Sequence, residues 1–277
     1  MSPSPLQDSD HSLPTATAGR IIYDFGANNG DNIPYYLKKA ELVVAVEANP
    51  ALCAQIESRF ASAIHEGKLR IENCVLLGEG NNPEVPFYLH RRNSVLSQFP
   101  EPDSSVIQNY DKVLLPSKSV LEILEAHGPP FYIKIDIEHC EQAILKELFR
   151  SGVRPPYISA ESHSIQVFAL LAGMGEYGAF KLVDGASIAS KYRNHAIQVD
   201  GHPEMYSFPR HSAGPFGDDI AGEWRNADDL FERLAAEKLG WKDIHATSLV
   251  HLDPVSRAQK KRYITRHLSG WLRSKFQ

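Results

Sequence analysis

Cysteine is scarce in this sequence, whose 277 residues include only Cys53, Cys74 and Cys140. Their small number and irregular spacing exclude a disulfide framework and a zinc knuckle, because both need several closely spaced thiols. We therefore expect reduced and mostly buried thiols, as is usual in a cytoplasmic protein.

Long apolar runs and a strong positive charge are also missing. No stretch approaches the roughly twenty apolar residues of a membrane helix, so we expect no transmembrane segment. Residues 1–19 are rich in Ser, Pro, Thr and Asp and have no basic start followed by an apolar run, which predicts a disordered tail rather than a secretory signal. The formal net charge of -5 at pH 7 argues against nucleic acid as a partner and favours a small molecule.

From Arg20 onward, short apolar runs alternate with helical patterns. Buried strands are expected at 21–25, 42–46, 69–77, 131–136, 157–161 and 180–183, and residues 85–89 are expected to be an extended segment. Helices are expected between them, including one that begins with a capping box formed by Ser119 and Glu122. The alternation predicts an α/β fold in which helices cover both faces of a mostly parallel sheet, with right-handed crossovers.

The length favours one principal domain, which we expect over residues 20–200, with residues 201–277 packed on it as a substrate loop and C-terminal helices. Residues 91–116 show little periodicity and are expected to form a loop. Residues 201–223 are expected to be an irregular substrate loop, because long loops are uncommon unless they function, and an ordinary surface crossing is the alternative. Residues 255–277 predict a basic amphipathic helix that packs on the core, with a membrane surface or nucleic acid as the alternative partner.

A glycine turn follows the first expected strand, in the segment from Asp24 to Gly30. Gly26 and Gly30 allow a ligand to approach the backbone closely, and Asn28 offers hydrogen bonds. The Gly-x-x-x-Gly spacing departs from the Gly-x-Gly-x-x-Gly loop that binds a pyrophosphate, which disfavours a dinucleotide. The Asp24 carboxylate suits the ammonium group of an amino acid better than it suits a phosphate.

Glu47 ends the second expected strand, 21 residues after Gly26. An acid at this position can accept both hydrogen bonds from a ribose diol. The two acids together therefore favour a nucleoside that carries an amino-acid group, and a purely structural turn is the alternative.

The segments Asp24 to Gly30, Val46 to Pro50 and Ile133 to Glu138 resemble the FkbM family of S-adenosylmethionine-dependent methyltransferases, and the resemblance covers about residues 20 to 185. It implies a class I methyltransferase fold, a Rossmann-like three-layer sandwich with a mostly parallel seven-stranded sheet, here with a C-terminal helical extension. The implied activity is the methylation of a hydroxyl on a small molecule or sugar.

The same resemblance implies which residues hold the cofactor. The methionine part would be held by Asp24, Gly26, Asn28 and Gly30 of the first segment, and the ribose by Glu47 and Asn49 of the second. The adenine would lie near Asn73, which follows the third strand. Ser94 would belong to a serine-rich loop.

Methyl transfer mainly requires the acceptor to be aligned and its proton to be removed. Asp136 is the first candidate for this base because it ends the fourth expected buried strand, and Glu138 follows it. Glu161 and His163 occupy the matching end of the next strand. His139 stands where the family usually has Gly, and it either accepts the proton or begins the helix with its ring in solvent. Helix capping is the structural alternative for the acids.

Asp136, Glu161 and His163 also offer oxygen and nitrogen ligands for a divalent cation, although their spacing does not demand one and metal-free catalysis is favoured. Two other functions share the predicted fold. One is a nicotinamide-dependent oxidoreductase, which should show the missing pyrophosphate loop. The other is a non-catalytic interaction module.

Overall fold

The computed structural model describes residue 17, residues 19–80 and residues 82–252. The basic helix expected at 255–277 and most of the tail expected at 1–19 lie outside these residues. In the part of the chain that the structure describes, no helix combines the length and the apolar character that crossing a membrane requires.

A seven-stranded sheet forms the centre of the molecule. Its order is β3 (Leu69–Glu72), β2 (Leu42–Val46), β1 (Ile21–Phe25), β7 (Tyr132–Ile135), β8 (Tyr157–Glu161), β12 (Lys242–Thr247) and β9 (Ala179–Asp184). All neighbours pair in parallel except β12, which runs antiparallel to both β8 and β9. The order reverses between β1 and β7, so a crevice opens beyond the carboxyl ends of these two strands.

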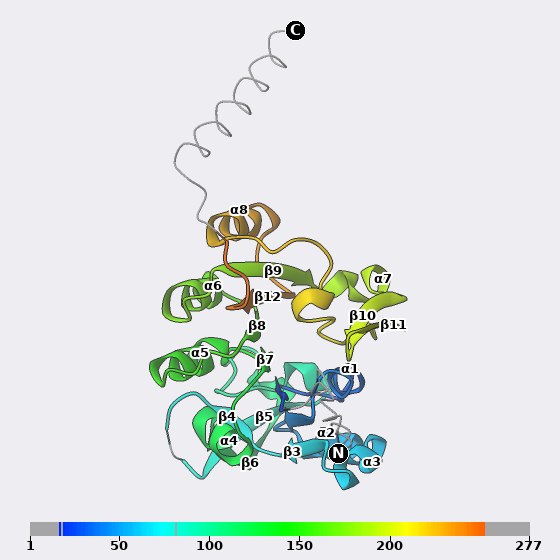
Figure 1. The fold of residues 1–277 in the computed structure, drawn as a ribbon. Helices are drawn as coiled ribbons and strands as arrows, with labels where there is room; N and C mark the ends of the chain where they lie inside the picture. The colour runs from blue at the N-terminus through cyan, green and yellow to red at the C-terminus, as the bar shows by residue number, and fades with distance from the viewer. Residues whose placement is uncertain (1–16, 18, 81, 253–277) are drawn as a thin grey trace, which may run out of the picture.

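Helices cover both faces of this sheet (Figure 1). One face packs against α4 (Val120–His127), α5 (Glu141–Arg150), α6 (Ile165–Ala169) and α8 (Ala227–Glu237). The other face packs against α1 (Ile33–Tyr36), α2 (Pro50–Arg59), α3 (Ala61–His65) and α7 (Ile188–Lys191). Short turns η1 (Ser94–Leu96), η2 (Ile107–Asn109), η3 (Leu170–Met174), η4 (Gly185–Ser187) and η5 (Gly217–Asp219) lie in the connections. The predicted α/β sandwich with a mostly parallel seven-stranded sheet is therefore confirmed.

Two local predictions are confirmed as well. The Ser119 hydroxyl accepts the Glu122 amide at 3.2 Å, and the Glu122 carboxylate accepts the Ser119 amide at 2.6 Å, so α4 begins with the capping box. The three cysteines are buried and form no disulfide.

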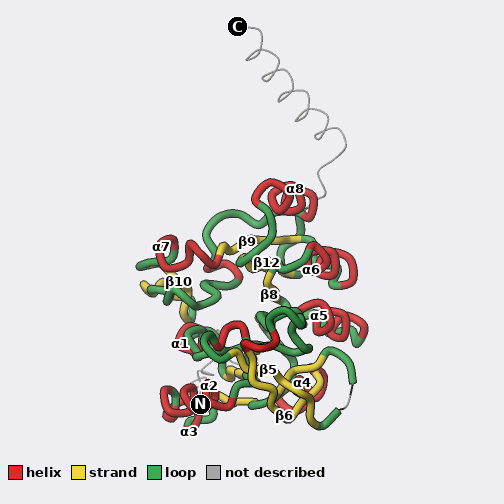
Figure 2. Tube along the Cα trace, turned by 180° about the vertical axis from the view of Figure 1, so that it is seen from behind, coloured by secondary structure: helices red, strands yellow, loops and turns green. Residues whose placement is uncertain are grey.

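A second, three-stranded sheet corrects two expectations. The single strand expected at 69–77 is divided into β3 and β4 (Val75–Leu77), because the Asn73 side chain turns back to donate to backbone oxygens of Glu47 and Ala48. The strand β4 pairs with β6 (Tyr110–Ser119), which also pairs with β5 (Glu84–His90) beside α4 (Figure 2). The loop expected at 91–116 is wrong for residues 110–116, because exposed charged residues hide the strand pattern of β6.

The expected irregular loop at 201–223 is also partly regular. Residues 202–206 form β11 (His202–Tyr206), which makes a hairpin with β10 (His195–Val199). Asp200 and Gly201 both have positive φ, at 49° and 81°, as tight hairpin turns require. Residues 212–217 of the same segment are buried against the sheet. The Ala213 amide donates to Asn32 Oδ1 at 2.7 Å, and the Phe216 ring stacks on the ring of Tyr132 in β7.

Candidate active site

The site begins at the glycine turn that follows β1. Gly26 has a φ of +82°, and a Cβ atom there would lie 1.9 Å from the backbone oxygen of Asp136. Only glycine therefore allows this turn to lie so close to the loop after β7. Gly30 has a different surrounding: a Cβ atom there would meet the side chains of Ile33, Ile56 and Phe60, so this glycine permits close helix packing and does not line the cavity described next.

A cavity lies beyond the carboxyl ends of β1, β2 and β7. Its polar wall includes Gly26, Asn28, Glu47, Ser94, Asp136 and Glu138. Its apolar wall includes Leu52, Val75, Leu76, Phe87, Phe99 and Ile137. A ligand with charged groups at one end and a flat apolar ring at the other is complementary to these two walls.

Glu47 is held at the rim of the cavity by backbone donors. One carboxylate oxygen accepts the Asn28 amide at 2.8 Å, and the other accepts the Asn49 amide at 2.8 Å. Burial raises the pKa of Glu47 to about 7, although the two amide donors oppose this shift. The Asn49 side chain caps α2 by accepting the Ala51 amide, and Asn73 holds the loop after β2, so neither side chain lines the cavity.

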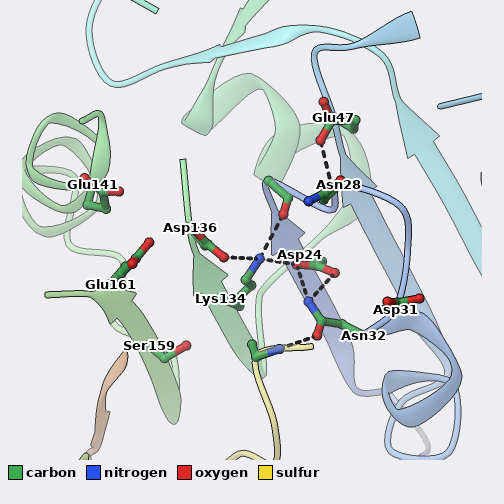
Figure 3. A network of polar contacts seen from close by, with 12 residues as sticks. Asp24, Asn28, Asp31, Asn32, Glu47, Lys134, Asp136, Glu141, Ser159 and Glu161 are labelled. Carbon is green, nitrogen blue, oxygen red and sulfur yellow. Dashed lines mark hydrogen bonds and ion pairs between the residues drawn. The ribbon is translucent and has the colours of Figure 1, made fainter. Parts of the chain in front are cut away.

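Asp24 lies beneath the cavity and does not line it. Its carboxylate is fully buried, forms an ion pair with Lys134 Nζ at 3.2 Å and accepts Asn32 Nδ2 at 3.2 Å (Figure 3). Burial raises the pKa of Asp24, and Lys134 and Asn32 oppose that shift. The sequence predicted that this carboxylate would bind the amine of a ligand. In this structure it contacts Lys134 and Asn32 instead.

Lys134 is the residue that connects both strand ends. Its Nζ donates to the backbone oxygen of Gly26 at 2.8 Å and pairs with Asp24 and Asp136, each at 3.2 Å. Burial alone would lower the pKa of Lys134, but the carboxylates of Asp136, Asp24 and Asp243 raise it, so the side chain stays charged. The sequence offered one signal for this role: a lysine inside a buried strand needs buried partners.

The carboxyl groups of Asp136 and Glu161 interact at the ends of β7 and β8. Burial, followed by the nearby Asp136 charge, raises the pKa of Glu161, so Glu161 donates a hydrogen bond to Asp136. Burial favours a higher pKa for Asp136 too, but Lys134 and this hydrogen bond outweigh it and lower the pKa. Asp136 is thus an ionised carboxylate on the cavity wall, with its side chain 40% exposed.

The other predicted catalytic residues lie around His163. Its Nδ1 lies 3.3 Å from Glu141 Oε1, and its Nε2 lies 3.4 Å from Glu161 Oε1 and 3.8 Å from Glu138 Oε2. The hydrogen bond with Glu141 raises the pKa of His163. The His139 ring centroid is 5.7 Å from that of His163, and His139 does not line the cavity.

Sequence reasoning missed Glu141 and Asp243 in this cluster. Glu141 is the first residue of α5, and its side chain is 2% exposed. Asp243 belongs to β12 and lies opposite Glu161 in the register of the sheet. A strand with a charged residue in its middle gives no strong apolar signal, whereas a glutamate at a helix start looks like an ordinary cap.

Comparisons with known proteins extend this description. The family model described as the Methyltransferase FkbM domain matches residues 24–179. No curated protein sequence matches significantly.

Several solved structures are similar. Methyltransferase FkbM from Methylobacillus flagellatus KT is 16% identical with a TM-score of 0.41, and the match covers 60% of this chain and 40% of that chain. Precorrin 8w decarboxylase from Methanobacterium thermoautotrophicum is 11% identical with a TM-score of 0.39, and the match covers 84% of each chain. An S-adenosylmethionine-dependent O-methyltransferase from Thermotoga maritima is 9% identical with a TM-score of 0.35, and the match covers 86% of this chain and 63% of that one. The match thus spans less than two thirds of the first and third proteins.

Proposed function

Because this chain belongs to the FkbM methyltransferase family, we propose that it transfers the methyl group of S-adenosylmethionine to a hydroxyl on a small molecule or sugar. The observation that carries this proposal is the convergence of Gly26, Glu47 and Asp136 on one cavity from the ends of three neighbouring strands. Strand ends at a reversal of strand order are where open α/β sheets bind their ligands.

The residues of the cavity fit the cofactor that the family implies. Glu47 has a carboxylate at the rim for the ribose hydroxyls, and Gly26 lets the backbone approach the amino-acid part. The apolar wall that includes Leu76 and Phe99 offers a surface for the adenine ring. When bound, S-adenosylmethionine supplies a methyl group on a positively charged sulfur.

The protein then has to orient the acceptor and receive its proton. Asp136 is suited to both tasks, because Lys134 and Glu161 hold it ionised and it faces the cavity. In the proposed reaction, the acceptor hydroxyl would donate to Asp136, and its proton would move to that carboxylate as the new bond between oxygen and carbon forms. The bond between the methyl carbon and sulfur would break at the same time, with S-adenosylhomocysteine as the leaving group. Glu138, on the same wall, is the second candidate for this role.

Calorimetry with S-adenosylhomocysteine and with NADH tests the cofactor. Binding of S-adenosylhomocysteine alone supports the proposal, binding of NADH alone replaces it with an oxidoreductase, and binding of neither points to an interaction module. A screen of sugars and other hydroxyl compounds with labelled methyl donor, read by mass spectrometry, tests the acceptor. Transfer only to amines or carbon would contradict the assignment of oxygen.

A further inference from the structure

A group of metal-ligating side chains lies next to the cavity. Glu141 at the start of α5, Glu161 at the end of β8 and His163 each offer one ligand atom, and these atoms all lie within 4.8 Å of one another. The side chains of Glu141 and Glu161 are 2% and 9% exposed, so both carboxylates are largely removed from water. Figure 3 shows Glu141 and Glu161 gathered with Asp136 beside the strand ends.

Asp243 is an independent sign that this cluster binds a cation. The residue is 9% exposed, and its carboxylate makes no hydrogen bond or ion pair with any residue that the structure describes. Asp243 lies directly opposite Glu161 in the antiparallel pairing of β12 with β8, so the two side chains project from the same face of the sheet. Burying a carboxylate without a donor is strongly unfavourable, and a bound cation would relieve that cost.

The acidic side chains of the cluster also outnumber the basic ones. Lys134 already pairs with Asp24 and Asp136 and donates to the Gly26 carbonyl. His163 lies within ion-pair distance of three carboxyl groups, those of Glu138, Glu141 and Glu161. Counting Asp243, six carboxylates share these two cationic side chains in the described part of the chain. Glu161 carries a proton in the free protein, and a divalent cation would displace that proton and bind the carboxylate.

We propose that Glu141, Glu161 and His163 form a binding site for one divalent cation, with Asp243 supplying further negative charge. Carboxylate oxygens with one imidazole nitrogen suit Mn²⁺ and related ions better than they suit Ca²⁺, which prefers oxygen alone. The group differs from the set expected from sequence, because Glu141 takes the place of Asp136, which faces the cavity.

The position of the site suggests its use. Glu161 lies beside Asp136, so the ion would lie one carboxylate away from the cavity wall and would take the place of the proton that Glu161 carries in the free protein. From there it can attract an acceptor oxygen and favour loss of its proton. This use rests on the proposed function, whereas cation binding itself does not.

Titration of the metal-free full chain with MnCl₂, followed by the electron paramagnetic resonance signal of free Mn²⁺, tests the site. We expect one bound ion per chain, and we expect Glu161→Gln and His163→Ala each to weaken its binding about tenfold or more. Asp111→Asn, which changes an exposed carboxylate distant in sequence, serves as the control and should leave the affinity unchanged. Cooperative thermal unfolding of every variant shows that the fold is retained, and Glu141→Gln replaces any variant that fails to fold.

The proposal is overturned if the wild-type chain binds no Mn²⁺, or if both variants bind it as the wild type does. Binding of methylammonium in place of Mn²⁺ would also overturn it, because the cluster would then recognise an organic cation. S-adenosylhomocysteine affinity, measured on the same sample with a chelator present, reports separately on the proposed function.

Discussion

At the scale of single residues, Lys134 determines the geometry of the site. Its ammonium group contacts the β1 turn, the buried Asp24 and the cavity-lining Asp136. Because its ammonium group pairs with Asp136 and is itself fixed by the buried Asp24, the lysine sets both the position and the charge of Asp136. Lys134 is thus a positioning residue rather than a group that meets the substrate.

Lys134→Met should therefore strongly destabilise the folded protein. It leaves Asp24 buried without its cation, and we expect a loss of about 3–5 kcal/mol in the free energy of unfolding. Lys118→Met is the matched control, because Lys118 pairs with Glu72 while 44% exposed and should cost about 1 kcal/mol or less. Urea unfolding measures both, and equal losses would contradict the role of Lys134. Adding Asp24→Asn to Lys134→Met should restore part of the stability.

The Asp136 carboxylate is expected to act in turnover rather than in cofactor binding. Asp136→Asn should reduce the rate of methyl transfer by about a hundredfold or more, while S-adenosylhomocysteine affinity stays within a few-fold of wild type. Glu138→Gln is the comparison, because both residues line the same wall. A larger loss in Glu138→Gln than in Asp136→Asn would transfer the role of base to Glu138.

Glu47 should make cofactor binding depend on pH. Its pKa of about 7 means that the carboxylate takes up a proton as the pH falls through this value and then offers fewer acceptors to a ribose diol. S-adenosylhomocysteine affinity should fall below about pH 7, approaching tenfold per pH unit. Glu47→Gln should bind weakly at every pH between about 6 and 8. Calorimetry across this range checks both, and a wild-type affinity independent of pH would contradict the prediction.

For the free protein, the sign of this effect is reversed. The folded state holds the Glu47 proton more tightly than an unfolded chain with a pKa of 4.5. Glu47 therefore contributes most to stability below pH 4.5, and this contribution is lost as the pH rises through about 7.

At the scale of elements, the turn after β1 must pass directly over the loop after β7. Gly26→Ala would place a methyl group 1.9 Å from the Asp136 backbone oxygen, so one of the two loops must move. We expect S-adenosylhomocysteine affinity to fall by about tenfold or more, on the scale of a lost charged hydrogen bond. Gly80→Ala is the control, because its φ is also positive, at +104°, but nothing lies within 4 Å.

Calorimetry and thermal melting separate the two effects of this change. Gly80→Ala should lower stability by about 1 kcal/mol through backbone strain and leave ligand affinity unchanged. Equal ligand affinity in Gly26→Ala and wild type would show that the close approach of the two loops is not needed for binding.

The elements also show how far the sequence could be interpreted. The strands β1, β2, β7 and β8 were predicted because each is a short apolar run followed by a polar turn or helix start. The strand β12 was missed because Asp243 and His245 interrupt its apolar pattern, yet both are buried in the sheet. A buried polar side chain is stabilised by neighbours from other strands, and sequence spacing does not reveal those neighbours.

The same reason limits the prediction of the site. Glu47 and Asp136 were predicted from their places at strand ends, and both line the cavity. Asp24 was expected beside the ligand, but the structure surrounds it with Lys134 and Asn32. Nothing in the spacing of these three residues distinguishes a carboxylate that faces a ligand from one that anchors a lysine beneath it.

At the scale of the whole molecule, the C-terminal part is needed to complete the central sheet. We propose one folding unit that extends from β1 through β12, because Ile244 is fully buried between β8 and β9. In this proposal, the segments before and after residue 200 share one core. The hairpin of β10 and β11 and the buried residues 212–217 lie between these segments in sequence.

A chain that ends at residue 200 should show no cooperative unfolding by circular dichroism. Ile244→Ala in the full chain should keep a cooperative transition but lose about 2–5 kcal/mol, as large-to-small changes in a core do. Leu249→Ala, at a position that is 59% exposed, should change stability by about 0.5 kcal/mol or less. A cooperatively folded chain of residues 20–200 would contradict the single folding unit.

The late position of β12 has a consequence for how this chain is made. During synthesis, β8 and β9 emerge before the strand that lies between them, so each leaves an edge of unpaired amides and carbonyls exposed until Lys242–Thr247 arrives. Such edges can pair with any other extended peptide, including the same strand of a second nascent chain. Rapid production at high temperature should therefore favour inclusion bodies, and slower translation or a chaperone that shields extended segments should increase the yield of native protein.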